Sequence, residues 1–351
     1  MGRRTYKTAL IGTGRIGFSL GFDKKREQPA SHTMALRKNK SFVIEAGCDT
    51  DSERLANWKK HTSVQKVYSS AEALFADSSP EVVVIAVNEN AHLDVTLKAI
   101  DAKPKLIILE KPVALNLDDA MKIQTVSTER GVPILINHER RFSEDYNAAK
   151  EYLPKIGKIL TINARLDSGL YVYNPDAEES GAYSLLHDGT HLVDTVLFLL
   201  EDICGEENIL KNTSISSVSY DEKNRKIIRA VSAHFTADKC ADVNLFFSGQ
   251  SRFFGFEIDI IGREGRIKVG NGIFALYKRE ESRLYSGFYS LEKDKMIHRP
   301  KKTQYFSNMI QNAANFLNGT SPLLSNLQTG INAMRILEEI KRALQETSQR
   351  D

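Results

Sequence analysis

The chain has 351 residues, more than one hydrophobic core usually supports, so two domains are expected. Its 48 basic residues barely outnumber its 45 acidic residues, and its three cysteines lack metal-type spacing, which argues against nucleic-acid binding, a disulfide framework and a metal site. No apolar stretch reaches the roughly 20 residues that a bilayer requires, and no secretory signal precedes the first expected strand, so a cytoplasmic protein without a membrane partner is expected.

A glycine-rich turn follows the first expected strand, residues 8–11. It has GxGxxG spacing: Gly12 permits the tight turn, Gly14 lets the backbone approach a pyrophosphate, and Gly17 allows the next helix to pack closely on the strand. The amides at the start of that helix, together with its dipole, would face the phosphates of a dinucleotide. An ordinary strand-to-helix turn is the alternative. The residues of this turn assigned to cofactor binding are Gly12, Gly14, Arg15, Ile16 and Gly17.

The second expected strand, residues 42–48, ends at Asp49, a carboxylate placed to hydrogen-bond ribose hydroxyls. The segment between the fingerprint and Asp49 exceeds the roughly 20 residues that are usual. The excess, within residues 18–40, is expected to leave the sheet as a loop or a lengthened helix at the edge where ligands bind. His32 in this segment would cover the cofactor, reach the substrate or take no part.

The alternation of apolar strands and amphipathic helices continues to about residue 137. One helix is expected over residues 117–130, with Asn116 as its N-cap and Gly131 at its end. Such alternation is typical of a doubly wound parallel sheet, so residues 1–137 are predicted to form an α/β Rossmann domain. Its other strands are expected at 82–87, 106–109 and 134–136.

After residue 137 the pattern changes to serial strands separated by short turns, which favours an open, largely antiparallel sheet. We therefore predict an α+β domain over residues 138–351. An exposed sheet face rich in apolar residues would invite a second copy of the chain, so a homodimer or homotetramer is expected. Helices are expected at 185–200, 305–317 and 330–345. The expected strands are 158–166, 214–220, 227–235, 243–247, 253–261, 266–269 and 273–277.

Glu110, Lys111 and Pro112 follow the expected strand 106–109, at the carboxyl edge of the sheet, where doubly wound folds place their active sites. Lys111 would bring a positive charge to that edge. Pro112 makes a cis peptide bond possible, which would aim the preceding residue. A Lys-Pro turn on the protein surface is the alternative interpretation of these three residues.

Two histidines occur in the expected helix 185–200. His187, His191 and Asp194 recur at helical spacing and share one face, whereas apolar residues line the opposite face. A histidine can take the proton of an alcohol near neutral pH while a nicotinamide takes the hydride. A zinc site is the competing interpretation, but it lacks a third and a fourth ligand. A hydrogen-bonded helix face at a domain boundary is the third interpretation.

The combination of these motifs resembles the glucose-fructose oxidoreductase, inositol dehydrogenase and rhizopine-catabolism (Gfo/Idh/MocA) family over nearly the whole chain. The resemblance implies an N-terminal Rossmann domain that binds NAD or NADP, and a C-terminal α/β domain whose open sheet supports the substrate and often an oligomer contact. The segments that carry the resemblance, in the family's order, are GTGRIG, the strand end at Asp49, VVVIAVNENAH, EKP, RRFSEDYNAAKEYLPKIGKI and the G-x-H-x-x-D of Gly189, His191 and Asp194.

Several residue roles follow from the resemblance. Lys111 would orient the reacting hydroxyl and favour its deprotonation, and His191 would exchange the proton. Glu110 of the same EKP motif, and His92 in the loop after the fourth strand, would lie near the cofactor. Asp49 is followed by another carboxylate and by no arginine, and a second carboxylate would repel a 2′-phosphate, so NAD is expected rather than NADP.

The sequence departs from the family at two points. The family usually has an aspartate four residues before the histidine that exchanges the proton, but here that position is His187, with Asp188 one step later. Two nearby imidazolium ions would depress each other's pKa. His187 would therefore act as acid or base itself or bind an anionic group of the substrate. Asn88 and Glu89 replace the family's Pro-Asn pair, which affects packing beside the nicotinamide. Asn88 is still expected to contact the cofactor.

The leading hypothesis is an NAD-dependent oxidoreductase that transfers hydride between the nicotinamide and a secondary alcohol of a sugar, sugar derivative or cyclitol. His191, with His187 and Asp188, would handle the hydroxyl proton, and Lys111 would position the hydroxyl. Two alternatives stay open: a redox-neutral glycosidase that uses tightly held NAD, and a non-catalytic regulator that binds NAD or a sugar. No metal ion is expected to take part.

Overall fold

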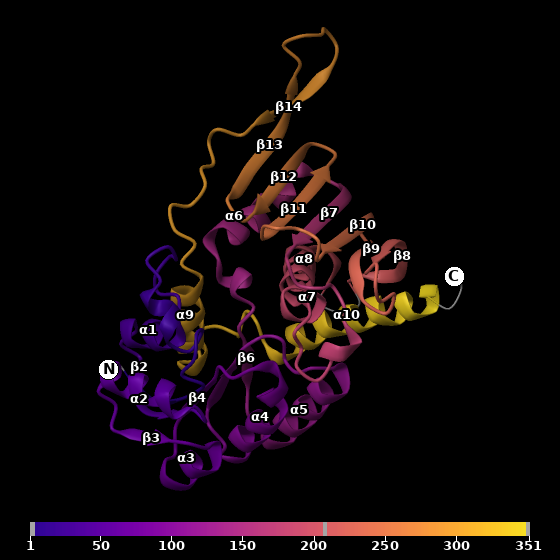
Figure 1. Cartoon of the computed structure of the whole chain (residues 1–351). Coiled ribbons are helices and arrows are strands. Elements are labelled where there is room, and N and C mark those ends of the chain that lie inside the picture. The colour runs from indigo at the N-terminus through magenta and orange to yellow at the C-terminus, as the bar shows by residue number, and fades with distance from the viewer. Residues whose placement is uncertain (1–3, 206–208, 349–351) are drawn as a thin grey trace. The chain divides into compact units, whose positions relative to one another are not determined.

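The computed structural model describes residues 4–205 and 209–348, which form two compact units (Figure 1). The first unit comprises the described residues up to 143 together with residues 302–331, and the rest forms the second unit. Each unit contains one β-sheet. No described helix is both long enough and apolar enough to cross a membrane.

The first unit contains a six-stranded sheet in the order β3-β2-β1-β4-β5-β6, in which every pair of neighbours is parallel. This order confirms the predicted doubly wound architecture. The strands are β1 (Tyr6–Ile11), β2 (Phe42–Cys48), β3 (Lys66–Tyr68), β4 (Val82–Ile85), β5 (Leu106–Leu109) and β6 (Ile134–Ile136). The helices are α1 (His32–Lys38), α2 (Ser52–Thr62), α3 (Ala71–Asp77), α4 (His92–Asp101), α5 (Leu117–Arg130) and α9 (Tyr305–Leu317).

Local sequence signals set both ends of α5, whose bounds agree with the prediction. The side-chain oxygen of Asn116 accepts a hydrogen bond from the backbone N–H of Asp119 at 2.8 Å, which satisfies one of the amides left without a partner in the first turn. Gly131 adopts a φ of +65° and ends the helix. Both capping signals are local in the sequence, which explains why the bounds of this helix could be predicted.

Residues 302–331 pack with the first unit, although the predicted boundary assigned everything after residue 137 to the second domain. Within this segment α9 lies beside α1 (Figure 1). Its apolar side chains, among them Phe306 and Met309, join the core of the parallel sheet together with Leu10. The apolar face of α9 thus covers one face of the Rossmann sheet. The sequence does not indicate this contact, because the partners lie far apart in the chain.

The second unit contains an eight-stranded sheet in the order β14-β13-β12-β11-β7-β10-β9-β8. Only β7 and β10 pair in parallel, which confirms the predicted open, largely antiparallel sheet. The strands are β7 (Ile159–Asp167), β8 (Lys211–Tyr220), β9 (Ile228–Ala237), β10 (Cys240–Ser248), β11 (Gly255–Gly262), β12 (Gly265–Gly270), β13 (Ile273–Glu281) and β14 (Tyr289–Lys293). The helices are α6 (Glu144–Tyr152), α7 (Ser184–His187), α8 (Gly189–Cys204) and the part of α10 (Leu327–Ser348) from residue 332 onward.

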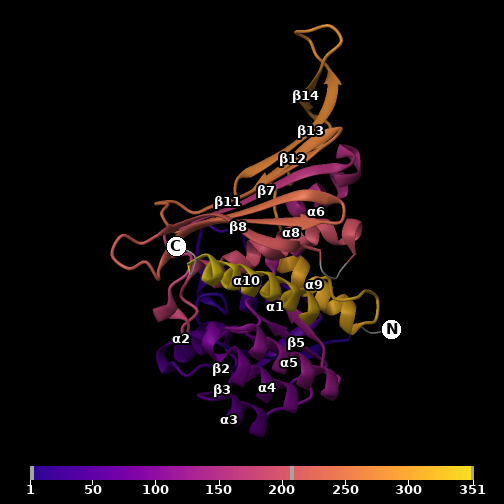
Figure 2. The same cartoon turned by 90° about the vertical axis from the view of Figure 1, so that its right-hand side faces the viewer.

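Helices α6 and α8 pack on one face of this sheet (Figure 2). In β11 and β12 the side chains that alternate with the buried ones are mostly charged. Arg266 of β12 pairs with Asp259 of β11, and Lys268 pairs with Glu257 at 2.8 Å. This part of the face is therefore polar, and the expected homo-oligomer stays a prediction.

Candidate active site

Three neighbouring strands of the first sheet, β1, β4 and β5, end at the same edge. The glycine turn follows β1, the exposed Asn88 follows β4, and Glu110 and Lys111 follow β5. Asp49 follows β2, on the other side of β1. Since the carboxyl ends of parallel strands lie along one edge, the first unit brings these predicted residues together at the place where such folds bind ligands.

The glycine turn has the form that a pyrophosphate requires. Gly12 has a φ of +96°, and a Cβ on Gly17 would lie only 2.0 Å from the carbonyl oxygen of Gly12, so neither position admits a side chain. A Cβ on Gly14 would meet only Nη1 of Arg54, at 3.7 Å. Within the described part of the chain, no acceptor is found for the backbone N–H groups of residues 14–16. Open space beside unused donors fits the diphosphate of a dinucleotide.

Of the two alternatives expected for the excess length after the fingerprint, a loop or a lengthened helix, the structure has the loop. After one turn the chain leaves as a loop, and α1 begins only at His32. The backbone N–H of His32 donates to the carbonyl oxygen of Ile16 at 3.1 Å, and that of Thr33 donates to Gly17 at 3.0 Å. Through these two hydrogen bonds α1 continues the helical turn that ends the glycine-rich segment, and the residues between them form the loop. This arrangement accounts for the excess length before the second strand.

Asp49 lies against the glycine turn. Its Oδ2 accepts hydrogen bonds from the backbone N–H of Thr13 at 2.7 Å and from the Thr13 hydroxyl at 2.9 Å. Its Oδ1 accepts from the backbone N–H of Asp51 at 3.0 Å. The carboxylate therefore fastens the turn to the end of β2, while Oδ1 keeps a lone pair for a further donor. The contact between Asp49 and a ribose hydroxyl stays a prediction.

Arg54 is a candidate that the sequence analysis missed. It lies in the first turn of α2, where Asp51 caps the helix and forms an ion pair of 3.2 Å with its guanidinium. Its Nη1 is the neighbour of Gly14 described above. No motif marks this arginine, because only the turn from β2 into α2 carries it back to the glycine turn. A cation at this point would favour the approach of a phosphate.

Lys111 is half-buried. Each of its two chain neighbours, Glu110 and Pro112, is hydrogen-bonded to a buried histidine. Before it, Oε1 of Glu110 lies 2.6 Å from Nε2 of His32. After it, the Lys111–Pro112 peptide bond is cis, and the carbonyl oxygen of Pro112 accepts a hydrogen bond from Nδ1 of His92 at 2.7 Å. Both histidines are 0% exposed, so His32 points inward rather than over the edge. The expected cofactor contact of His92 stays a prediction.

Glu110 is an ionised carboxylate in a buried position. Burial alone would raise its pKa, but the hydrogen bonds from His32 and Asn137 and the positive charge of Lys111 hold the pKa of Glu110 below its ordinary value. Nδ2 of Asn137 donates to Oε1 at 2.6 Å. Asn137 and the neighbouring His138 were not among the predicted site residues, because nothing in their local sequence indicates that they pack against the EKP motif.

Two buried histidines make the stability of the first unit depend on pH. Burial lowers the pKa of His92, and burial together with the charge of Arg141 lowers the pKa of His138 well below its usual range. The unfolded chain binds these protons near pH 6.5, whereas the folded unit does not. We therefore expect the free energy of unfolding to fall as the pH drops below about 6.5, by up to about 1.4 kcal/mol per pH unit for each histidine.

Trp58 reports this effect, because it is the chain's only tryptophan and is 0% exposed within the first unit. Urea unfolding followed by its fluorescence, between about pH 7 and pH 5, measures the dependence on pH. His138→Gln should reduce the slope, since glutamine does not titrate. Equal stability across this range would show that both imidazoles can be protonated in the fold.

The remaining candidates lie in the second unit, where the helix expected at 185–200 is divided. Helix α7 ends at His187, and α8 begins at Gly189, after Asp188. The expectation of one continuous helix is therefore wrong at this point. Gly189 packs closely on the sheet, since a Cβ there would lie 3.1 Å from the ring of Phe247 in β10. The close approach of α8 to the sheet and the weak helix propensity of glycine account for the break.

His187, Asp188 and His191 are each half-buried, and Asp194 is 1% exposed. The backbone N–H of His191 donates to the carbonyl oxygen of Asp188 at 3.1 Å, which places His191 in the first turn of α8. Among the described residues, no group of three His, Cys, Asp or Glu side chains is arranged to hold a metal ion. The joint action of these residues with Lys111 of the first unit stays a prediction.

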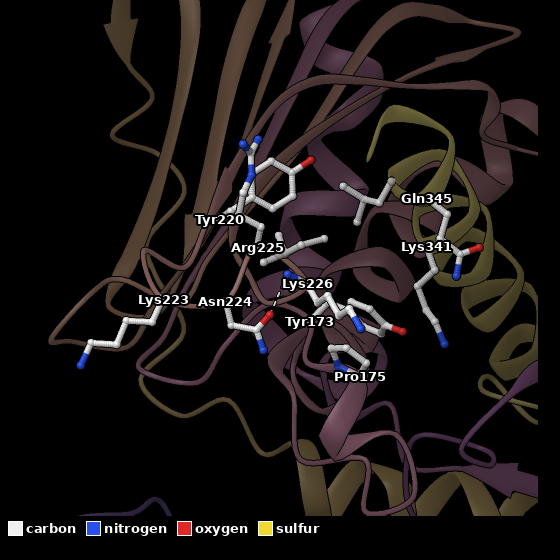
Figure 3. Close-up of a pocket in the computed structure, with 11 residues that line it drawn as sticks. Tyr173, Pro175, Tyr220, Lys223, Asn224, Arg225, Lys226, Lys341 and Gln345 are labelled. Carbon is white, nitrogen blue, oxygen red and sulfur yellow. Dashed lines mark hydrogen bonds between the residues drawn. The ribbon is translucent and has the colours of Figure 1, made fainter. Parts of the chain in front are cut away.

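A pocket in the second unit contains none of these candidates (Figure 3). Its volume is about 760 Å³, and it lies between the loop of Tyr173, the turn from β8 to β9 and the end of α10. Lys341 lies in its wall, but Glu178 pairs with the ammonium at 3.2 Å and the Tyr173 ring centroid lies 5.7 Å away. The other cations of the lining, Lys223 and Arg225 among them, are exposed. The pocket therefore adds nothing to the candidate site.

Comparison with known proteins agrees with these features. A sequence profile described as "Oxidoreductase family, NAD-binding Rossmann fold" matches residues 6–138, which contain all six strands of the parallel sheet. The profile is that of the Gfo/Idh/MocA family, so this segment of the chain is similar to the family's NAD-binding domain. The family resemblance expected from the sequence motifs is thus supported for residues 6–138.

Individual relatives cover different shares of the chain. The 1,5-anhydro-D-fructose reductase of Ensifer adhaerens is 29% identical over 161 residues, which are 44% of this chain and 47% of that protein, so the chain spans about half the relative's length. The myo-inositol 2-dehydrogenase of Thermotoga maritima is 23% identical over 255 residues, 62% of this chain and 71% of that protein. The solved oxidoreductase of Agrobacterium radiobacter, in complex with NAD+, L-tartaric acid and magnesium, shares the fold with a TM-score of 0.72 at 19% identity and covers 96% of both chains.

Proposed function

We propose that this protein is an NAD-dependent dehydrogenase that oxidises a secondary alcohol of a sugar, sugar derivative or cyclitol. The observation that carries the proposal is the joint placement of the glycine turn, Asp49 and Lys111 at one edge of the parallel sheet. The names of two relatives, a sugar reductase and an inositol dehydrogenase, support the substrate class. The family supports the cofactor.

The proposed oxidation breaks one C–H and one O–H bond of the substrate. NAD, when bound, supplies the nicotinamide that accepts the hydride, and the hydroxyl proton passes to a protein base, so that the products are a ketone, NADH and a proton. The ammonium of Lys111 would orient the hydroxyl oxygen and stabilise the developing negative charge on it. His191 would take the proton, with His187 and Asp188 as further candidates for this role.

Asp49 supports NAD rather than NADP, because its carboxylate would bond a ribose hydroxyl and repel a 2′-phosphate. Asp49→Asn is expected to weaken NAD binding roughly 10-fold or more, since a hydrogen bond to a charged group contributes about 1.5–3 kcal/mol. NADP binding should weaken less, because the repulsion also disappears. Calorimetric titration with both coenzymes measures the ratio of the two dissociation constants. Asp77→Asn in α3 is the control, and an unchanged ratio in Asp49→Asn would contradict this role.

The activity is tested by incubating the protein with NAD and a panel of sugars, sugar acids and cyclitols while the absorbance of reduced nicotinamide is followed. Net reduction of NAD with at least one secondary alcohol is expected. NAD that copurifies with the protein, without net reduction but with cleavage of a glycoside, would instead indicate the redox-neutral alternative. No binding of NAD together with no reaction across the panel would refute the proposal.

A further inference from the structure

His32 connects the inserted loop to the motif that contains Lys111. It is the first residue of α1 and is fully buried. Its Nε2 lies 2.6 Å from Oε1 of Glu110, and Nδ2 of Asn137, just after β6, donates to the same oxygen at 2.6 Å. Side chains from two separate elements therefore converge on one carboxylate oxygen, directly before Lys111 in the chain.

The direction of these hydrogen bonds follows from the charge of Glu110. An ionised carboxylate only accepts hydrogen bonds, so His32 must donate from Nε2. The proton is thus assigned to Nε2 from the network of contacts. A residue that replaces His32 without loss of this contact needs an N–H donor with the same reach, which the amide of glutamine supplies.

His32 is itself held firmly by its surroundings. Its backbone N–H donates to the carbonyl oxygen of Ile16 in the glycine turn. Its ring packs edge to face against the ring of Phe306 in α9, with the centroids 5.1 Å apart. Phe306 belongs to the core of the first unit. His32 is therefore a fixed point that joins the nucleotide-binding turn, the core and Glu110.

Glu110 and Pro112 flank Lys111, so contacts that hold both neighbours also hold the backbone of the lysine. His92 donates to the carbonyl oxygen of Pro112 on one side. On the other side, His32 determines where the negative charge of Glu110 lies. The Lys111 ammonium interacts with that charge. The inserted region thus contacts the residue directly before the lysine.

We propose that His32 is a positioning residue, which through Glu110 sets the orientation of Lys111 at the carboxyl edge of the sheet. The inference rests on the proposed function only for the part that Lys111 plays in turnover. The contact between His32 and Glu110 also gives the inserted residues a structural role. The loop leaves after the glycine turn and returns at His32, so that one side chain couples the nucleotide-binding turn to the lysine.

The first readout needs no substrate: it is the rate at which an acylating reagent labels Lys111 in the full chain, measured by mass spectrometry. His32→Leu removes the donor and is expected to change this rate at least about tenfold, the factor that corresponds to one hydrogen bond to a charged group. His32→Gln keeps a donor and should restore the original rate. His61→Leu is the matched control, because His61 packs against Phe22 of the same loop, with ring centroids 5.3 Å apart. The labelling rate of Lys111 in this variant should equal that of the unmodified protein.

A second comparison distinguishes an effect through Glu110 from a loss of structure. Glu110→Gln removes the charge of the side chain and keeps its size. If His32→Leu fails to fold, the labelling rate of Lys111 is expected to change by the same factor in Glu110→Gln. The double variant should label at the rate of Glu110→Gln alone, because the inference has the His32 side chain act on the lysine through Glu110. Unchanged labelling of Lys111 in every variant, or effects of the two changes that multiply, would overturn the inference.

Turnover provides the third readout once a substrate is known. His32→Leu is expected to lower kcat while the NAD dissociation constant is unchanged, and His32→Gln should recover kcat. A purely structural role would instead lower stability in both variants without separating kcat from NAD binding. If no substrate is found but the labelling of Lys111 responds as expected, the proposed function fails and the positioning role of His32 stands.

Discussion

Lys111→Met is expected to lower the rate of hydride transfer by about 10²- to 10⁴-fold, the usual contribution of a residue that assists proton transfer. Methionine keeps the length and the apolar stem of lysine and removes its charge. Lys111 follows β5 at the edge where the glycine turn lies, and its backbone is held through Glu110 and Pro112. The fold and the NAD site should therefore survive the substitution. Steady-state kinetics and calorimetric titration with NAD measure the two properties separately.

The matched control for this substitution is Lys105→Met. Lys105 precedes β5 at the opposite edge of the sheet, where it pairs with Glu81 at 2.6 Å. Its loss should leave turnover unchanged. If Lys111→Met retained full activity, the lysine would not touch the reacting atoms and the proposed mechanism would be wrong. If it lost NAD binding as well, the lysine would serve the cofactor rather than the hydroxyl.

Gly14→Ala and Gly17→Ala are expected to separate cofactor binding from folding. A Cβ on Gly14 meets nothing closer than the Arg54 guanidinium, so the alanine variant should fold normally. The added methyl group occupies the space that a diphosphate needs to reach the amides of residues 14–16. Loss of one charge-assisted hydrogen bond would raise the NAD dissociation constant about 10- to 100-fold.

Gly17→Ala should act on stability instead. Its Cβ would lie 2.0 Å from the backbone carbonyl oxygen of Gly12, which cannot move without opening the turn. Overpacking of this kind costs about 1–3 kcal/mol or more. Trp58 fluorescence during urea unfolding measures the loss, and calorimetry measures NAD affinity. A Gly14→Ala variant that binds NAD normally would show that the dinucleotide does not approach the backbone there.

The sequence predicted those parts of the fold that depend on local pattern. The parallel strands β2, β5 and β6 and the helices α5 and α9 have the predicted bounds, because buried strands appear as apolar runs and the caps at Asn116 and Gly131 act locally. The strands β3 and β14 were missed. Both lie at the edge of a sheet and carry mostly polar, partly exposed side chains, so their hydrophobic pattern is weak.

The parts that escaped prediction depend on contacts between distant segments. The interruption of the first helix becomes visible only when the amides of His32 and Thr33 are seen to bond with Ile16 and Gly17. The placement of α9 with the first unit depends on the burial of its apolar face against the parallel sheet. Sequence spacing records neither arrangement, because the partners lie far apart in the chain.

The candidate site shows the same division. The glycine turn and the lysine motif could be located because strand ends mark the ligand-binding edge. Arg54 could not, since it reaches Gly14 only through the fold of the turn from β2 to α2. The contacts of Glu110 with His32 and Asn137 join three segments of the chain, and no pattern within any one of them indicates the others.

A crystal structure with NAD bound tests the central claim most directly. We expect a diphosphate against the backbone amides of residues 14–16, a ribose hydroxyl on Asp49 and the nicotinamide beside the ammonium of Lys111. A dinucleotide bound away from the glycine turn, or a nicotinamide out of reach of Lys111, would contradict it.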